Sequence, residues 1–150
     1  MLMDLIHDII TERKRKVMRM KEIKLGTTHQ AHTTVTAQAC ANVVGSGDVA
    51  VYATPMMIAL MEQAAKEAVK PFLEEDETTV GVHMNVSHDA PTPIGMKVIA
   101  KATITKVDRR MISYEVIAED ECGVIGKGVH QRVVVGATRF LEKCNAKCSR

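Results

Sequence analysis

The sequence predicts an α+β domain in which an antiparallel sheet wraps around one long central helix. Residues 55 to about 69 are strong helix formers, and after residue 77 apolar and polar residues alternate with period two. Short turns separate these alternating runs, and strands joined by short turns pair as antiparallel neighbours. One apolar helix and one such sheet make a two-layer domain.

The predicted helix follows Ala53-Thr54-Pro55. Threonine is a favourable N-cap, and proline fits the first helical position because no hydrogen bond needs its missing N–H. The first turns are apolar on nearly every side, which is typical of a buried central helix. The helix should end near Lys70-Pro71, since proline disfavours helical geometry at the residue before it.

A strand is predicted within residues 24–38, where Thr33-Thr34-Val35-Thr36 favours extended backbone. Alternation places four further strands after the helix, at residues 80–86, 96–105, 111–119 and 124–135. The closing segment, residues 140–147, is either a short helix or a frayed tail. This order of elements is that of the hot-dog fold. Its long strands leave an edge that a second copy can extend, so we expect a homodimer, with a tetramer as the alternative.

Residues 1–22 are interpreted as an N-terminal helical extension of the domain at 23–150. Leu2, Ile6 and Ile9 recur at helical spacing, and basic residues 13–16 follow them. A signal peptide has the reverse order, and no stretch is long enough to span a membrane. We expect a solvated or loosely docked helix and no stable membrane association, while a basic helix on an anionic surface stays the alternative.

Composition narrows the classes of function. The formal net charge is +2, and the aromatic residues are two tyrosines and two phenylalanines without tryptophan. Both facts argue against nucleic-acid binding, which needs a basic face or stacking side chains. The four cysteines are scattered, which favours reduced thiols and a cytoplasmic protein. No cofactor is indicated.

Glu62 is the only ionisable residue between Pro55 and Ala65. A carboxylate in an apolar setting is costly unless it is paired, protonated or functional. It is therefore either a structural acid satisfied by neighbouring groups, or a general base or nucleophile in a water-poor cleft.

Two other positions stand out. His88 lies where a strand gives way to a proline-rich turn, and functional groups often occupy such rims, although the histidine of a turn can merely hydrogen-bond backbone. Arg132 shares one face of its strand with Gly126, Gly128 and His130. Strand glycines indicate close approach of backbone or ligand. Residue type favours a solvated or salt-bridging Arg132 over a phosphate or carboxylate ligand.

A metal site is not predicted. His29 and His32 lie three positions apart and so face opposite sides of a strand, and the same holds for His83 and His88 at five positions. Metal binding needs several ligands that converge on one point.

Three blocks of sequence together resemble the hot-dog thioesterases of the fluoroacetyl-CoA thioesterase-like family, over about residues 21–147. The blocks are Ala53-Thr54-Pro55 through Leu60-Met61-Glu62, then Thr79-Val80-Gly81 with Val86-Ser87-His88 and Thr92-Pro93, and finally Ile125-Gly126 with Gly128 and His130-Gln131-Arg132.

The resemblance implies an acyl-CoA thioesterase for small acyl groups. It assigns catalytic roles to Thr54, Glu62 and His88, and it matches Gly81 to a glycine whose backbone amide holds the thioester carbonyl. Arg132 matches an arginine of the closing strand and is expected to bind substrate. The alternatives are a non-catalytic acyl-CoA-binding protein and a hot-dog enoyl-CoA hydratase.

Two observations qualify these implications. The fluoroacyl-selective type has several aromatic residues ahead of the helix, whereas residues 43–53 here contain only Tyr52. Thr54 and Glu62 are eight residues apart, or about 12 Å along one helix at ~1.5 Å per residue. They cannot touch within one helix, so we expect the active site to lie at a dimer interface.

Overall fold

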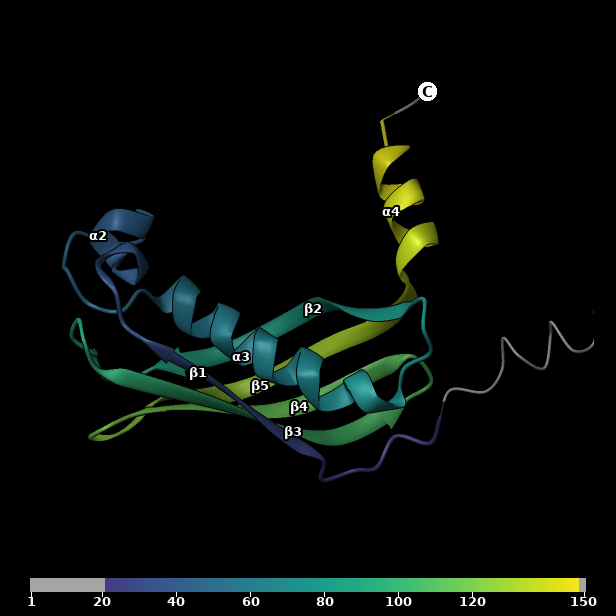
Figure 1. The fold of residues 1–150 in the computed structure, drawn as a ribbon, viewed down its shortest axis with the longest axis horizontal. Coiled ribbons are helices and arrows are strands. Elements are labelled where there is room, and N and C mark those ends of the chain that lie inside the picture. The colour runs from purple at the N-terminus through teal and green to yellow at the C-terminus, as the bar shows by residue number, and fades with distance from the viewer. Residues whose placement is uncertain (1–20, 149–150) are drawn as a thin grey trace, which may run out of the picture.

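The computed structural model describes residues 21–148, and the expected extension at 1–22 falls almost entirely outside them. In this range one sheet curves around helix α3 (Thr54–Val69), as predicted (Figure 1). The five strands are β1 (Thr28–Thr34), β2 (Glu77–His88), β3 (Lys97–Asp108), β4 (Met111–Asp120) and β5 (Gly123–Gly136).

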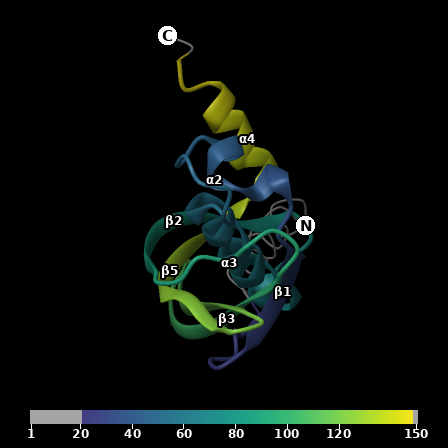
Figure 2. The same ribbon diagram turned by 90° about the vertical axis from the view of Figure 1, so that its left-hand side faces the viewer.

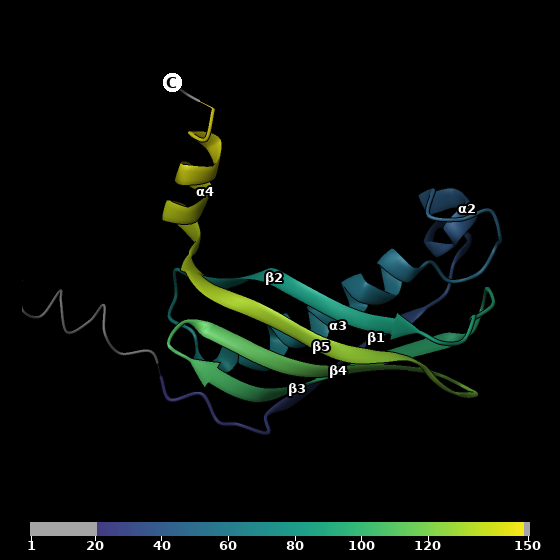
Figure 3. The ribbon, with the colours of Figure 1, turned by 180° about the vertical axis from the view of Figure 1, so that it is seen from behind.

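The strands lie in the order β1-β3-β4-β5-β2, and each pair is antiparallel. Strands β3, β4 and β5 follow one another through short turns, whereas β1 and β2 flank α3 in the sequence and end at opposite edges. Seen from behind, the sheet lies in front of α3 (Figure 3). Among the described residues β2 pairs only with β5, so its outer edge is open.

Three short helices accompany this framework: 3-10 turns at Ala37–Ala39 and Lys70–Phe72, and α2 at Ala41–Val44. The 3-10 turn at Ala37–Ala39 and α2, which both precede α3, were not predicted, because three or four residues are too few for a periodic signal. A longer helix, α4, spans Ala137–Asn145. Of the two alternatives for the closing segment, a short helix or a frayed tail, the structure therefore has the helix.

The start of α3 differs from the prediction by one residue. Ala53 is the N-cap and makes no side-chain capping bond, while Thr54 is already helical. The hydroxyl of Thr54 does not cap the helix because it is hydrogen-bonded to His88. The predicted N-cap is therefore wrong, and the reason concerns the candidate site.

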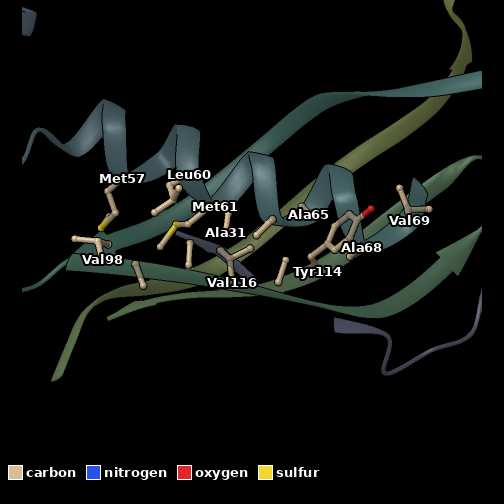
Figure 4. Packing of buried hydrophobic residues seen from close by; sticks show 14 of the residues in the cluster. Ala31, Met57, Leu60, Met61, Ala65, Ala68, Val69, Val98, Tyr114 and Val116 are labelled. Atoms are coloured by element: carbon tan, nitrogen blue, oxygen red, sulfur yellow. The ribbon is translucent and has the colours of Figure 1, made fainter. Parts of the chain in front are cut away.

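The core lies between α3 and the inner face of the sheet (Figure 4). Met57 and Met61 are fully buried, and burial of one such side chain contributes about 1.5–3 kcal/mol. Further along α3 the buried residues are small, and they face small residues of β3 and β4. These residues are Ala64, Ala65, Ala68, Ala100, Ala102 and Ala118. Alanine on both sides lets the helix lie close to the sheet.

The opposite side of α3 is not covered by the described residues. Met56, Ala59 and Gln63 are exposed there, and Ile58 and Glu62 are half-exposed. The prediction of a buried central helix therefore holds for the side of α3 that faces the sheet, and it is wrong for the opposite side of the helix in the single chain. An apolar first turn facing solvent is typical of a surface that another chain covers.

Candidate active site

Thr54 and His88 form the first of two polar clusters. Thr54 opens α3, His88 ends β2, and Thr54 Oγ1 lies 2.6 Å from His88 Nδ1. The other ring nitrogen, His88 Nε2, is buried and has no hydrogen-bond partner among the described residues. Such unpartnered buried groups are rare in folded proteins and often belong to functional sites.

The backbone before α3 is tied to its surroundings on both sides. Tyr52 N–H donates to Thr92 O, and Ala53 N–H donates to Ala39 O, both at 2.9 Å. The Tyr52 hydroxyl donates to Met56 O in the first turn of α3, and burial raises the pKa of Tyr52 to about 12. The segment that presents Thr54 is thus firmly positioned.

A cavity of about 290 Å³ opens beside this cluster. Thr54 and His88 line it together with residues of the α2 region and of the turn after β2, namely Ala41, Ser46, Val51, Tyr52, Asp89, Ala90 and Pro91. Ligand pockets start at about this size, so the cavity suits a small group rather than a whole nucleotide.

Glu62 and Arg132 form the second cluster, about two turns further along α3. Arg132 Nη1 donates to Glu62 Oε2 at 3.1 Å, and the exposed side-chain fractions are 7% for Arg132 and 43% for Glu62. The salt-bridging alternative for Arg132 is thus the one observed. The carboxylate is half-exposed, not buried as the sequence had indicated, because it lies on the uncovered side of α3.

Three further contacts hold the guanidinium of Arg132. Its Nε donates to Thr79 Oγ1 at 2.8 Å, and its Nη2 donates to Thr79 O at 2.9 Å. Its Nη1 also lies 3.2 Å from Nε2 of the buried His130. A planar guanidinium bound along its whole edge has a fixed orientation, and so does the carboxylate attached to it.

His130 completes this arrangement. Its Nδ1 lies 2.7 Å from the carbonyl oxygen of His83, which can only accept, so Nδ1 carries the proton and Nε2 accepts from Arg132. Burial lowers the pKa of His130, the hydrogen bond to His83 opposes this, and the charge of Arg132 adds to the lowering. The ring of Tyr114 stacks beside it at 6.0 Å. His130 is therefore a neutral acceptor at pH 7.

Gly81 makes room for the carboxylate. A methyl group at this position would lie 2.6 Å from Glu62 Oε2 and 3.3 Å from His130 Cε1. Gly81 pairs with Arg132 across the β2–β5 ladder, next to a register irregularity that ends at His83. The absence of a side chain here is what allows Glu62 to reach Arg132.

Gly126 and Gly128 of β5 serve packing. A methyl group on Gly128 would lie 2.1 Å from the backbone oxygen of Asn85, and one on Gly126 would lie 2.5 Å from that of Ser87 and 2.8 Å from Met57 Cε. The sequence indicated a close approach of backbone or ligand to these glycines. The groups that approach them are the backbone of β2 and the core residue Met57.

One chain does not unite the two clusters. In the part that the structure describes, no hydrogen bond joins Glu62 to Thr54 or to His88. Within residues 21–148 no three His, Cys, Asp or Glu side chains gather as metal ligands would. The helices described here are also too short or too polar to cross a membrane.

Comparison with known proteins identifies the family. A sequence model described as fluoroacetyl-CoA-specific thioesterase matches residues 35–138. The chain belongs to this family. The fluoroacetyl-CoA thioesterase of Streptantibioticus cattleyicolor is 41% identical over 97 residues, which are 65% of this chain and 67% of that protein.

Solved structures agree with this. A structure of a fluoroacetyl-CoA thioesterase has a TM-score of 0.80 at 29% identity and covers 85% of this chain and 98% of its own. A thioesterase superfamily member from Thermus thermophilus also has a TM-score of 0.80 at 29% identity, with 87% and 97% covered. The hot-dog fold is thereby confirmed, and the protein is a thioester hydrolase of the acyl-CoA thioesterase class.

Sequence reasoning missed the roles of Thr79 and His130. Thr79 was noticed only as part of a matching block, and His130 was given no role of its own. Alternation had placed His130 and Arg132 on one strand face, which was the available signal. The pairing of β2 with β5, which brings Thr79 opposite that face, was not visible in the sequence.

Proposed function

We propose that this protein hydrolyses small acyl-CoA thioesters at a site completed by two copies of the chain, with Glu62 as base or nucleophile. The observation that carries the proposal is the separation of two polar clusters on one helix. Thr54 contacts His88 and Glu62 contacts Arg132, yet each pair is only half of a hydrolytic site.

A two-fold axis through the open edge of β2 unites the halves. If two β2 strands pair antiparallel with Gly81 opposite the partner's His88, the axis passes between Met84 and Asn85. Glu62 lies beside Gly81, so it then faces the His88 and Thr54 of the second copy. In this arrangement the second copy would cover the exposed apolar first turn of α3. We therefore expect a homodimer and leave a tetramer as an assembly of such dimers.

The chemistry follows from the carboxylate. Glu62 takes a proton from water as the water oxygen attacks the thioester carbonyl carbon. The tetrahedral intermediate then expels the CoA sulfur, which receives a proton from Glu62 or His88. In the alternative, Glu62 attacks directly and water hydrolyses the resulting mixed anhydride. Backbone N–H donors, Gly81 included, would stabilise the oxyanion, each by about 3 kcal/mol.

The other residues take supporting roles. Arg132 is occupied by Thr79, His130 and Glu62, so we assign it to orienting the carboxylate in place of direct substrate binding. The hydrogen bond between Thr54 and His88 holds both side chains in place. Each of them can then contact the acyl group or the sulfur that leaves with CoA.

We expect a short acyl group, and the cavity of about 290 Å³ beside Thr54 and His88 has room for one. The curated relative acts on fluoroacetyl-CoA. The cavity here has one aromatic residue, Tyr52, so we propose hydrolysis of small acyl groups without a requirement for fluorine. The described cysteines Cys40, Cys122, Cys144 and Cys148 are free thiols, which supports a cytoplasmic location.

Subunit mixing tests the composite site. Glu62→Gln and His88→Ala homodimers should each have lost hydrolysis of acetyl-CoA, measured by free-thiol release. After exchange of subunits, half of the dimers are mixed and each has one intact site, so about a quarter of wild-type activity should return. Mixing His88→Ala with Thr54→Ala is the control, since their defects fall in the same half-site and cannot complement.

Two results would contradict the proposal. Wild-type hydrolysis by both single variants would remove the assigned residues from the mechanism. Tight binding of acyl-CoA without release of free thiol would instead favour a non-catalytic binding protein.

A further inference from the structure

Helix α4 carries an apolar side that nothing in the described chain covers. None of its residues is buried, and Phe140 and Leu141 are 44% and 60% exposed. With Ala137 and Cys144 they recur at the spacing of one helical face, while Arg139 and Glu142 lie on the other. A helix of nine residues is marginal in water by itself, so an uncovered apolar face on it indicates a missing partner.

The base of α4 is fixed to the domain. Ala137 N–H donates to Asp76 O at 2.7 Å, and the Thr138 hydroxyl donates to Asp76 Oδ1 at 2.9 Å. Asp76 belongs to the turn ahead of β2, so this turn sets the direction in which α4 leaves the sheet. That direction leads past β2, beyond the open edge (Figures 1 and 3).

A second exposed apolar segment lies at the other end of the molecule. We call residues 41–51 the α2 segment. Its Val43, Val44 and Val49 are exposed, and its Ala41 and Val51 line the cavity beside Thr54. The α2 segment also extends beyond β2, and in a view along the molecule it overlaps α4, so both leave the sheet on the same side (Figures 1 and 2).

The two-fold axis of the proposed dimer exchanges the two ends. Glu77 pairs with Gly136 at the base of α4. In the register that places Gly81 opposite the partner's His88, Glu77 lies beyond the end of the partner's β2, toward the turn that follows His88 and contains Thr92. Thr92 O accepts from Tyr52 N–H, so this position adjoins the end of the α2 segment. Each α4 therefore rises next to the α2 segment of the other copy.

We infer that α4 docks its Phe140 and Leu141 onto the α2 segment of a second copy of this chain, where it supports the outer wall of that copy's acyl cavity. This inference rests on the dimer of the proposed function. Charge agrees with it: Asp48 is the only charged residue of the α2 segment, and Lys143 adjoins Phe140 on α4. Substrate binding in one subunit then depends on the C-terminal helix of the other.

Cross-linking tests the contact directly. Cys122→Ser and Cys148→Ser leave Cys144 as the exposed thiol of α4, and Val43→Cys adds one on the α2 segment. A short bismaleimide should join these positions between chains and give a covalent dimer. The same background with Lys101→Cys, on the outer face of β3, and the background without an added cysteine are the controls.

Substitution tests the consequence. Phe140→Ser with Leu141→Ser should raise the dimer dissociation constant roughly tenfold and raise KM for acetyl-CoA, since two anchors of an apolar contact are lost. Arg139→Ser with Glu142→Ser, on the opposite face of α4, should change neither.

The outcomes are separable. If a dimeric, active enzyme gives no more cross-linking than the controls, the docking of α4 is refuted while the composite site stands. If the apolar variant only converts tetramers into dimers, α4 joins dimers to one another and the inference is also refuted. If the protein is monomeric and active, the proposed composite site fails as well.

Discussion

We expect Gly81→Ala to lower the activity of this enzyme while leaving its stability nearly unchanged. The added methyl group would lie 2.6 Å from Glu62 Oε2, closer than such contacts occur, so one of them must move. Glu62 Oε2 is the far end of a half-exposed side chain, so the carboxylate, and not the backbone, is the group that the methyl group displaces from Arg132. The next contact, 3.3 Å to His130 Cε1, is tight but needs only a few tenths of an ångström.

The expected magnitudes follow from these contacts. Replacing glycine with alanine lowers the entropy of the unfolded chain, which stabilises the fold by a few tenths of a kcal/mol. This gain offsets the cost of the tight contact with His130. The free energy of unfolding should therefore change by less than about 1 kcal/mol. A carboxylate displaced by about 1 Å loses near-attack geometry, which costs on the order of 100-fold in kcat/KM. Urea unfolding and free-thiol release from acetyl-CoA measure the two quantities.

Gly128→Ala is the matched control. Its methyl group would lie 2.1 Å from the backbone oxygen of Asn85, and a backbone atom in a β ladder cannot swing away. This variant should lose about 3 kcal/mol of stability by forcing β2 away from β5. If Gly81→Ala has wild-type kcat/KM, the space at residue 81 does not position Glu62. In that case only the backbone amide of residue 81 can matter for activity. If Gly81→Ala loses as much stability as Gly128→Ala, its loss of activity is a consequence of damage to the fold.

Three further predictions concern the same clusters. Thr54→Ser keeps the hydroxyl bound to His88 and should retain most activity, whereas Thr54→Val should lose roughly tenfold or more in kcat/KM; equal activities would remove the hydroxyl from the mechanism. Arg132→Lys keeps the charge but cannot bind Thr79 and Glu62 together, so kcat should fall about 100-fold with little change in KM, and a selective rise in KM would instead indicate substrate binding. Burial lowers the pKa of His130 below its ordinary value of 6.5, so below that pH the unfolded chain binds a proton that the folded chain does not. The free energy of unfolding should therefore fall as the pH drops below 6.5 toward the folded pKa, and His130→Gln should remove that part of the slope in urea titrations at several pH values.

The element types were readable from the sequence because they depend on local periodicity. The helix from residue 55 and the four alternating strands are where the structure has them, and their order predicted the hot-dog topology. The candidate residues were likewise visible, because an isolated glutamate in an apolar run and a histidine at a strand end are local anomalies.

The contacts of those residues were not readable, because each depends on a strand register. Arg132 meets Thr79 only through the pairing of β2 with β5, and the same register places Gly81 against Glu62. The neighbour of Thr54 was also unexpected: a residue predicted to cap α3 contacts His88 instead.

The sequence by itself thus predicted the fold class from the order and period of its elements, while its motifs carried the resemblance to the family and marked the candidate site residues. Tertiary structure alone decided that these side chains form two separate clusters, that Glu62 lies on an uncovered face of α3, and that α4 leaves the domain past an open strand edge. The physical reason is that a carboxylate, a guanidinium or a helix face acquires its surroundings from segments dozens of residues away. Their arrangement is fixed only when the sheet closes around the helix.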